Sequence, residues 1–101
     1  MALYANGFDW DKGNRAKCEQ HGLSVSTIEE LFTRPLALLP DTAHSQNERR
    51  FRAIGRTEKG RGVFFVFTLR RKGEEVLIRP ISARYMHKKE IEAFEKENPH
   101  L

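Results

Sequence analysis

The stretch RRFRAIGRTEKGRGVFFVFTLRRKGEEVLIRPIS, residues 49–82, decides the fold. It contains three runs of strand length that are bounded by turn residues: Arg49–Arg56, Val63–Arg70 and Val76–Ser82. The two links between these runs carry glycine and have the length of hairpin loops. The stretch therefore predicts three consecutive antiparallel strands, a meander.

The last of these strands has two unusual residues. Pro80 cannot donate a ladder hydrogen bond, which predicts that the strand lies at a sheet edge or is irregular there. Strand alternation places Arg79 on one face with two apolar neighbours. An arginine there needs a partner. Two alternatives stay open: an ion pair with Glu48 or Glu58, and a phosphate of a ligand.

A short strand and two helices are expected upstream of the meander. Phe8–Asp11 alternates apolar and polar residues, as a half-buried strand does, and Asp11 can cap a helix that ends near His21. Ser26–Glu29 has the spacing of a capping box, which predicts the start of a second helix. This helix has to end before Pro35, whose ring disfavours a helical residue in front of it.

One more strand and one more helix complete the expected order. Leu36–Leu39 is an apolar run of strand length, and His87–Glu97 has helical spacing with Ile91 and Phe94 facing the sheet. The order is β-α-α-β-β-β-β-α. We therefore expect a single α+β domain over residues 1–101, with a small twisted antiparallel sheet packed by two N-terminal helices and one C-terminal helix.

The charge is concentrated in the middle of the chain. The net charge is +4, but residues 49–89 carry thirteen basic and three acidic side chains, whereas residues 1–48 and 90–101 are each net acidic. A segment of one sign favours a polyanionic partner such as nucleic acid. The alternative is that these arginines only solvate exposed strand faces.

Several classes of protein are not supported. No apolar run is long enough to cross a bilayer, and the N-terminus has no signal-peptide pattern, so we expect a cytoplasmic protein without membrane contact. The single cysteine, Cys18, excludes an internal disulfide. Cys18 and His21 are the only close pair of metal-ligand types, and no glycine-rich loop precedes a helix. We therefore expect neither a metal nor a cofactor.

The remaining arginine, lysine, histidine, glutamate and tyrosine residues suit the chemistry of a phosphodiester. Arginine offers a planar fork to phosphate oxygens, histidine or glutamate can move a proton, and an aromatic ring can stack an unpaired base. In RNA cleavage the 2′-hydroxyl is an internal nucleophile, so no metal is obligatory. Basic residues alone are equally compatible with a module that binds RNA or DNA without cleaving it.

A series of separated motifs resembles the BrnT family, the toxin halves of bacterial type II toxin–antitoxin pairs. The resemblance covers roughly residues 8–95. The motifs are Phe8–Asp11, Asn14–Lys17, His21-Gly22 with Ser24, His44-Ser45 with Glu48 and Arg50, Ile54–Arg56, Gly60-Arg61 and Ile81–Arg84.

The resemblance implies a RelE-like endoribonuclease that cleaves RNA by 2′-hydroxyl attack, needs no metal and arrests translation. It also implies a BrnA-like antitoxin with a ribbon-helix-helix part, which neutralises the toxin in a heterotetramer of two copies each. Operator DNA would then be contacted only through the antitoxin. A toxin homologue that is inactive and acts through its antitoxin complex is the alternative.

Site residues are carried over from the family motifs as expectations. Glu48 or His44 would be the base, and Arg79 and Arg84 would clamp the phosphate. Tyr85 or His87 would act as acid or stacking platform. The expected RNA-binding residues are Arg50, Arg56, Arg61, Arg70, Tyr85, His87 and Lys88.

Two departures from the family pattern bear on activity. Tyr85–His87 replaces the smaller residues that many relatives carry after the Ala-Arg pair, and Phe94 stands where many carry tyrosine. If that tyrosine takes part in cleavage elsewhere, its replacement affects activity and leaves the fold intact.

Overall fold

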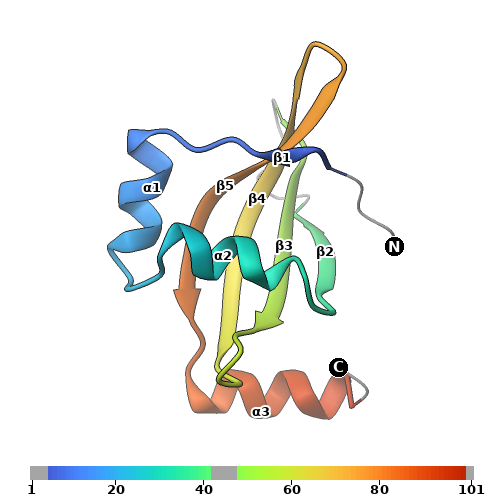
Figure 1. Cartoon of the computed structure of the whole chain (residues 1–101). Helices are drawn as coiled ribbons and strands as arrows, with labels where there is room; N and C mark the ends of the chain where they lie inside the picture. The colour runs from blue at the N-terminus through green and yellow to red at the C-terminus, as the bar shows by residue number, and fades with distance from the viewer. Residues whose placement is uncertain (1–4, 42–47, 100–101) are drawn as a thin grey trace.

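The computed structural model describes residues 5–41 and 48–99 of the chain, and its order of elements is the predicted one (Figure 1). The elements are β1 (Gly7–Phe8), α1 (Lys12–Glu19), α2 (Val25–Leu31), β2 (Ala37–Asp41), β3 (Arg50–Arg56), β4 (Gly62–Lys72), β5 (Glu75–Tyr85) and α3 (Lys88–Glu97). No helix in the described ranges is both long enough and apolar enough to span a membrane.

The five strands form one sheet in the order β1-β5-β4-β3-β2. Strands β2 to β5 pair antiparallel in sequence order, so the predicted meander is confirmed. Strand β1 instead pairs parallel with β5, through Gly7 opposite Leu77 and Phe8 opposite Ile78. The sheet is therefore mixed, not purely antiparallel. A two-residue strand carries no sequence signal for its direction, which depends on where the rest of the chain places it.

Strand β5 is longer than predicted and is irregular where proline interrupts it. Val66 of β4 lies opposite Ser82, whereas the next residue, Phe67, lies opposite Pro80. One extra residue of β5, Ile81, therefore stands between the two pairs, as in a β-bulge. The irregularity that the missing amide hydrogen of Pro80 predicts is confirmed.

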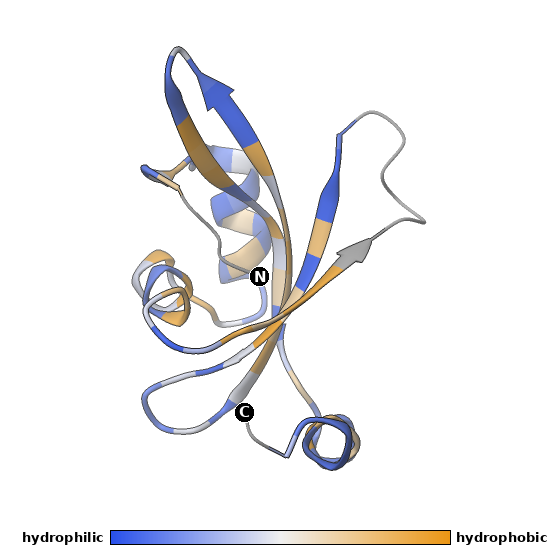
Figure 2. Ribbon diagram, turned by 90° about the vertical axis from the view of Figure 1, so that its right-hand side faces the viewer, coloured by the Kyte–Doolittle hydropathy of each residue, from blue (hydrophilic) through white to orange (hydrophobic). Residues whose placement is uncertain are grey.

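Helices α1 and α2 cover one face of the sheet, and α3 lies towards the other face at one end (Figures 1 and 2). The covered face holds the core, in which aromatic rings dominate. The ring of Phe32, just after α2, makes edge contacts with Phe8, Phe65 and Phe67 at centroid distances of 5.2–5.4 Å. Such contacts add to the burial of each ring and fix how α2 sits on the sheet.

The first helix begins as predicted, and the second begins elsewhere. Asp11 caps α1 in a capping box with Asn14. The N-cap of α2 is Ser24, whose hydroxyl accepts a hydrogen bond from the Thr27 amide at 3.2 Å, so the predicted box starting at Ser26 is wrong. The carboxylate of Glu29 instead accepts a hydrogen bond from Trp10 Nε1 at 2.9 Å, a tertiary contact that the local spacing does not reveal.

Helix α3 begins at Lys88, one residue later than predicted, because His87 is its N-cap, and it approaches the sheet at a glycine. Ile91 and Phe94 are half-buried, and the helix has no fully buried residue. A β-carbon at Gly62 would lie 3.0 Å from Cγ1 of Ile91, so a larger residue there would push the helix away. Helix α3 thus closes one end of the sheet without covering it.

Candidate functional site

The face of the sheet opposite α1 and α2 is rich in arginine. Directly paired residues of antiparallel strands lie on the same face. The register gives three cross-strand rows: Arg50–Thr68–Arg79, Arg52–Val66–Ser82 and Ile54–Phe64–Arg84. We call this surface the open face. Its polar members that are exposed or partly exposed are Arg50, Arg52, Arg70, Arg79, Ser82 and Arg84.

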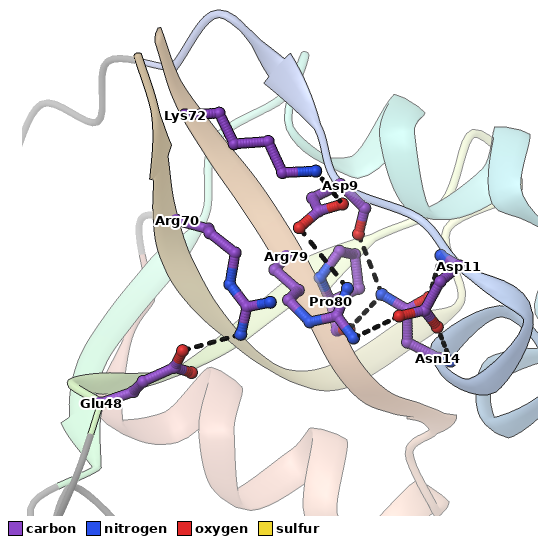
Figure 3. A network of polar contacts seen from close by, with 8 residues as sticks. All are labelled: Asp9, Asp11, Asn14, Glu48, Arg70, Lys72, Arg79 and Pro80. Atoms are coloured by element: carbon purple, nitrogen blue, oxygen red, sulfur yellow. Dashed lines mark hydrogen bonds and ion pairs between the residues drawn. The ribbon is translucent and has the colours of Figure 1, made fainter. Parts of the chain in front are cut away.

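Arg79 lies within a network of polar contacts at one end of the open face (Figure 3). Its Nη2 lies 2.5 Å from Oδ2 of Asp11, and its Nη1 lies 3.5 Å from Oδ2 of Asp9. Lys72 Nζ also donates to Asp9, at 3.2 Å. The Arg79 side chain keeps 20% of its surface exposed. One edge of the guanidinium is thus fixed by two carboxylates.

The partner of Arg79 is neither of the two glutamates considered from the sequence. Asp9 and Asp11 follow β1, and the parallel pairing of β1 with Leu77 and Ile78 brings them beside Arg79. The pKa of Asp11 is lowered by the hydrogen bond from the Asn14 amide and further by the hydrogen bond from Arg79. Asp11 therefore stays ionised and caps α1 while it holds the arginine.

Glu48 lies beside this network and binds a different arginine. Its Oε1 is 2.7 Å from Nη2 of Arg70, which is a diagonal neighbour of Arg79 across the β4–β5 pair (Figure 3). The structure thus brings Glu48, Arg70 and Arg79 to one end of the open face. His44 lies outside the described residues.

Arg84 stands at the other end of the open face, next to α3. Its Nη1 and Nη2 donate to the two carboxylate oxygens of Glu90, each at 2.8 Å, and its Cζ lies 5.1 Å from the centroid of the Phe64 ring. The pKa of Glu90 is lowered to about 2, chiefly by the hydrogen bond from Arg84 and then by that from the His87 amide. Arg84 and Arg79 therefore do not converge on one point.

Arg52 lies between these two ends and was not among the residues expected from the sequence. It is exposed in the middle of β3, opposite Val66. Within residues 5–41 and 48–99 it has no ion-pair or hydrogen-bond partner. The alternation of outward-facing and buried residues along β3 would have identified Arg52, because Arg50, Arg52 and Arg56 all occupy outward-facing positions between buried residues.

The other residues expected to bind RNA are dispersed. Arg56 points to α3, with Nη2 2.7 Å from Oε1 of Glu95. The guanidinium of Arg61 stacks on Tyr85 at 3.6 Å, and Tyr85 pairs with Val63 on the helix-covered side. His87 and Lys88 are exposed at the start of α3.

The open face suits the binding of a flexible polyanion. Arginine forks can contact phosphate oxygens, and the half-buried Phe64 and Val66 offer apolar surface for bases. No group of three or more His, Cys, Asp or Glu side chains in the described part of the chain is placed to hold a metal ion.

A model of one protein family matches residues 10–90, most of the 101-residue chain. That family is described as "Ribonuclease toxin, BrnT, of type II toxin-antitoxin system". No curated protein matches the chain.

Proposed function

The chain belongs to the BrnT family of ribonuclease toxins of type II toxin–antitoxin systems, and we propose that it cleaves RNA on its open face without a metal ion. The observation that supports this proposal most directly is the gathering of Arg50, Arg52, Arg70, Arg79 and Arg84 from three adjacent strands on one face. Single-stranded RNA can lay its phosphates along such a surface while its bases contact apolar side chains.

In the proposed reaction the 2′-oxygen of one nucleotide attacks the adjacent phosphorus. The arginines stabilise the negative charge that builds up on the phosphorane oxygens. Arg84 binds Glu90 through both terminal nitrogens, and its Nη1 also donates to the Tyr85 carbonyl at 3.5 Å. The second hydrogen of Nη2 and the Nε hydrogen can reach a phosphate. The carboxylate would thus orient the arginine and leave donors for the substrate. Glu48 or His44 is the proposed base.

We further propose that a BrnA-like antitoxin of the ribbon-helix-helix class neutralises the toxin in a complex of two copies each. A type II family implies a protein antitoxin. An acidic surface of that partner placed over the open face would exclude RNA, since both would use the same arginines. Operator DNA would be contacted by the antitoxin alone.

The test of the ribonuclease proposal is the purified chain with a labelled single-stranded RNA in excess EDTA. We expect cleavage by the parent, loss of cleavage in Arg84→Ala and in Arg79→Ala/Arg84→Ala, and parental cleavage in Arg71→Ala, an exposed arginine outside the set named above. Thermal unfolding of each variant checks that Arg79→Ala still folds without its contacts to Asp9 and Asp11.

Two outcomes would contradict the proposal in different ways. RNA that is bound in a salt-sensitive manner but never cut identifies a binding module or an inactive toxin homologue. The observation that favours this alternative is that carboxylates already bind both Arg79 and Arg84. Undiminished cleavage by the folded Arg84→Ala variant places the reaction elsewhere on the molecule.

A further inference from the structure

A small hollow lies where the open face meets the turn after α1. Its volume is about 90 Å³, and it is lined by His21, Phe64, Ser82, Ala83 and Arg84. Strand β5 has no neighbouring strand on this side within the described residues, because β1 pairs only with Leu77 and Ile78. A ligand can therefore approach the hollow from solvent along the edge of β5.

The backbone around His21 is held firmly although its side chain is exposed. The His21 amide donates to the Cys18 carbonyl at 3.2 Å, and the Leu23 amide donates to the same carbonyl at 3.3 Å. Cys18 and Leu23 are almost fully buried, and Gly22 turns the chain with a φ of +81°. Such a fixed turn places the imidazole at the edge of β5 reproducibly.

The imidazole of His21 has no hydrogen-bond partner among the residues that the structure describes. The groups beside it are a cationic fork, a hydroxyl and an aromatic ring, contributed by Arg84, Ser82 and Phe64. This set matches one phosphodiester of single-stranded RNA: the guanidinium hydrogens that Glu90 leaves free and the hydroxyl donate to phosphate oxygens, and the ring stacks a flanking base. It leaves the imidazole free to exchange a proton with the bound group.

We propose that His21 contacts the scissile phosphodiester and donates the proton that the leaving oxygen requires. This inference rests on the proposed ribonuclease function and adds a residue to it. The bond from the 2′-oxygen to phosphorus forms while the bond from phosphorus to the 5′-oxygen breaks. Protonated His21 gives its proton to that 5′-oxygen, and the proposed base takes the proton of the 2′-hydroxyl. The products are a 2′,3′-cyclic phosphate and a 5′-hydroxyl, and His21 regains a proton from water.

The experiment compares His21→Gln with Gln20→Ala, a change at the exposed neighbouring residue, which does not line the hollow. Each is tested on an RNA and on the same RNA with sulfur in place of the bridging 5′-oxygen, because a thiolate leaves without being protonated. We expect His21→Gln to cleave the oxygen substrate about 10² to 10⁴ times more slowly than the parent. On the sulfur substrate it should reach the parental rate, and Gln20→Ala should resemble the parent on both.

Other outcomes overturn the inference. A parental rate of His21→Gln on the oxygen substrate shows that His21 takes no part. Equal slowing on both substrates, with weaker RNA binding or a lower thermal unfolding temperature, assigns His21 to binding or to structure. A parent that cleaves neither substrate contradicts the ribonuclease proposal itself and this inference with it, so the two failures are distinguishable.

Discussion

At the residue scale, carboxylates orient the arginines of the open face in the free protein. Arg79 is held by Asp9 and Asp11, and Arg84 is held by Glu90. A guanidinium that is fixed in advance loses less conformational entropy when it binds a phosphate than a freely rotating side chain does. The same carboxylates also lower the net positive charge of the face. They therefore weaken its long-range attraction for RNA while they fix the orientation of the arginines.

The Arg84–Glu90 pair predicts a dependence of stability on acidic pH. The folded state lowers the pKa of Glu90 from 4.5 to about 2. At pH values between these two, the unfolded chain therefore binds a proton on Glu90 that the folded protein does not. The stabilisation is complete above about pH 4.5 and is lost as the pH falls towards 2. Urea unfolding at a series of pH values should show the parent more stable than Glu90→Gln at pH 7, with the difference vanishing near pH 2.

The control for this prediction is Glu92→Gln, an exposed residue of the same helix without an ion pair among the described residues. Its effect on the free energy of unfolding should be small across the whole range. A stability difference between the parent and Glu90→Gln that does not change with pH would refute the role of the ion pair.

At the element scale, one side chain joins α1 to the sheet. Asn14 is buried, and its Nδ2 donates to the carbonyls of Asp9 at 3.0 Å and Pro80 at 2.8 Å. Its Oδ1 accepts a hydrogen bond from the Asp11 amide at 2.8 Å, which completes the cap of α1. The two carboxylates that hold Arg79 therefore depend on Asn14 for their position (Figure 3).

Replacement of Asn14 by alanine should destabilise the fold. The change leaves the carbonyls of Asp9 and Pro80 without their donor and removes half of the capping box, so we expect the free energy of unfolding to fall by about 2 to 3 kcal/mol. Arg15→Ala, at an exposed position of the same helix, should change it by less than about 0.5 kcal/mol. Urea denaturation measures both; equal effects of the two changes would contradict the anchoring role.

At the scale of the whole molecule, the twisted sheet separates two kinds of surface. One face is covered by α1 and α2 (Figures 1 and 2) and holds the aromatic core, whereas the other presents the arginines of β3, β4 and β5. The basic segment of the sequence becomes a basic face only because β3, β4 and β5 lie side by side.

This arrangement predicts that one exposed arginine contributes more to RNA binding than another of equal charge. Arg52 lies in the middle of the open face, and Arg71 lies near the tip of the β4–β5 hairpin. The slope of log affinity for single-stranded RNA against log salt should fall by about 0.7 in Arg52→Ala, as one phosphate contact is lost, and should change little in Arg71→Ala. Identical slopes in the two variants would argue for attraction by net charge alone.

Most of the element order was predictable, because it depends on local signals. Hairpin glycines, the period of two, and the cap at Asp11 act within a few residues of each other. The family motifs pointed to the BrnT family, which the match over residues 10–90 confirms. The likeness to RelE-type ribonucleases stays a prediction.

The contacts of the candidate site were not predictable in the same way. The partners of Arg79 lie 68 and 70 residues away in sequence, and they reach it only because β1 pairs parallel with β5. His21 meets Arg84 at a hollow for a similar reason, since α1 directs the following turn to the edge of β5. No local pattern encodes such approaches.

By itself, the sequence determined the order of the strands and helices, the concentration of positive charge and the family, since each of these follows from residue type and short-range spacing. Only the tertiary structure decided the parallel direction of β1, the carboxylate partners of Arg79 and Arg84, and the place of His21 beside β5. The physical reason is that these contacts join segments far apart in the chain, and their geometry is set by how the helices pack on the sheet.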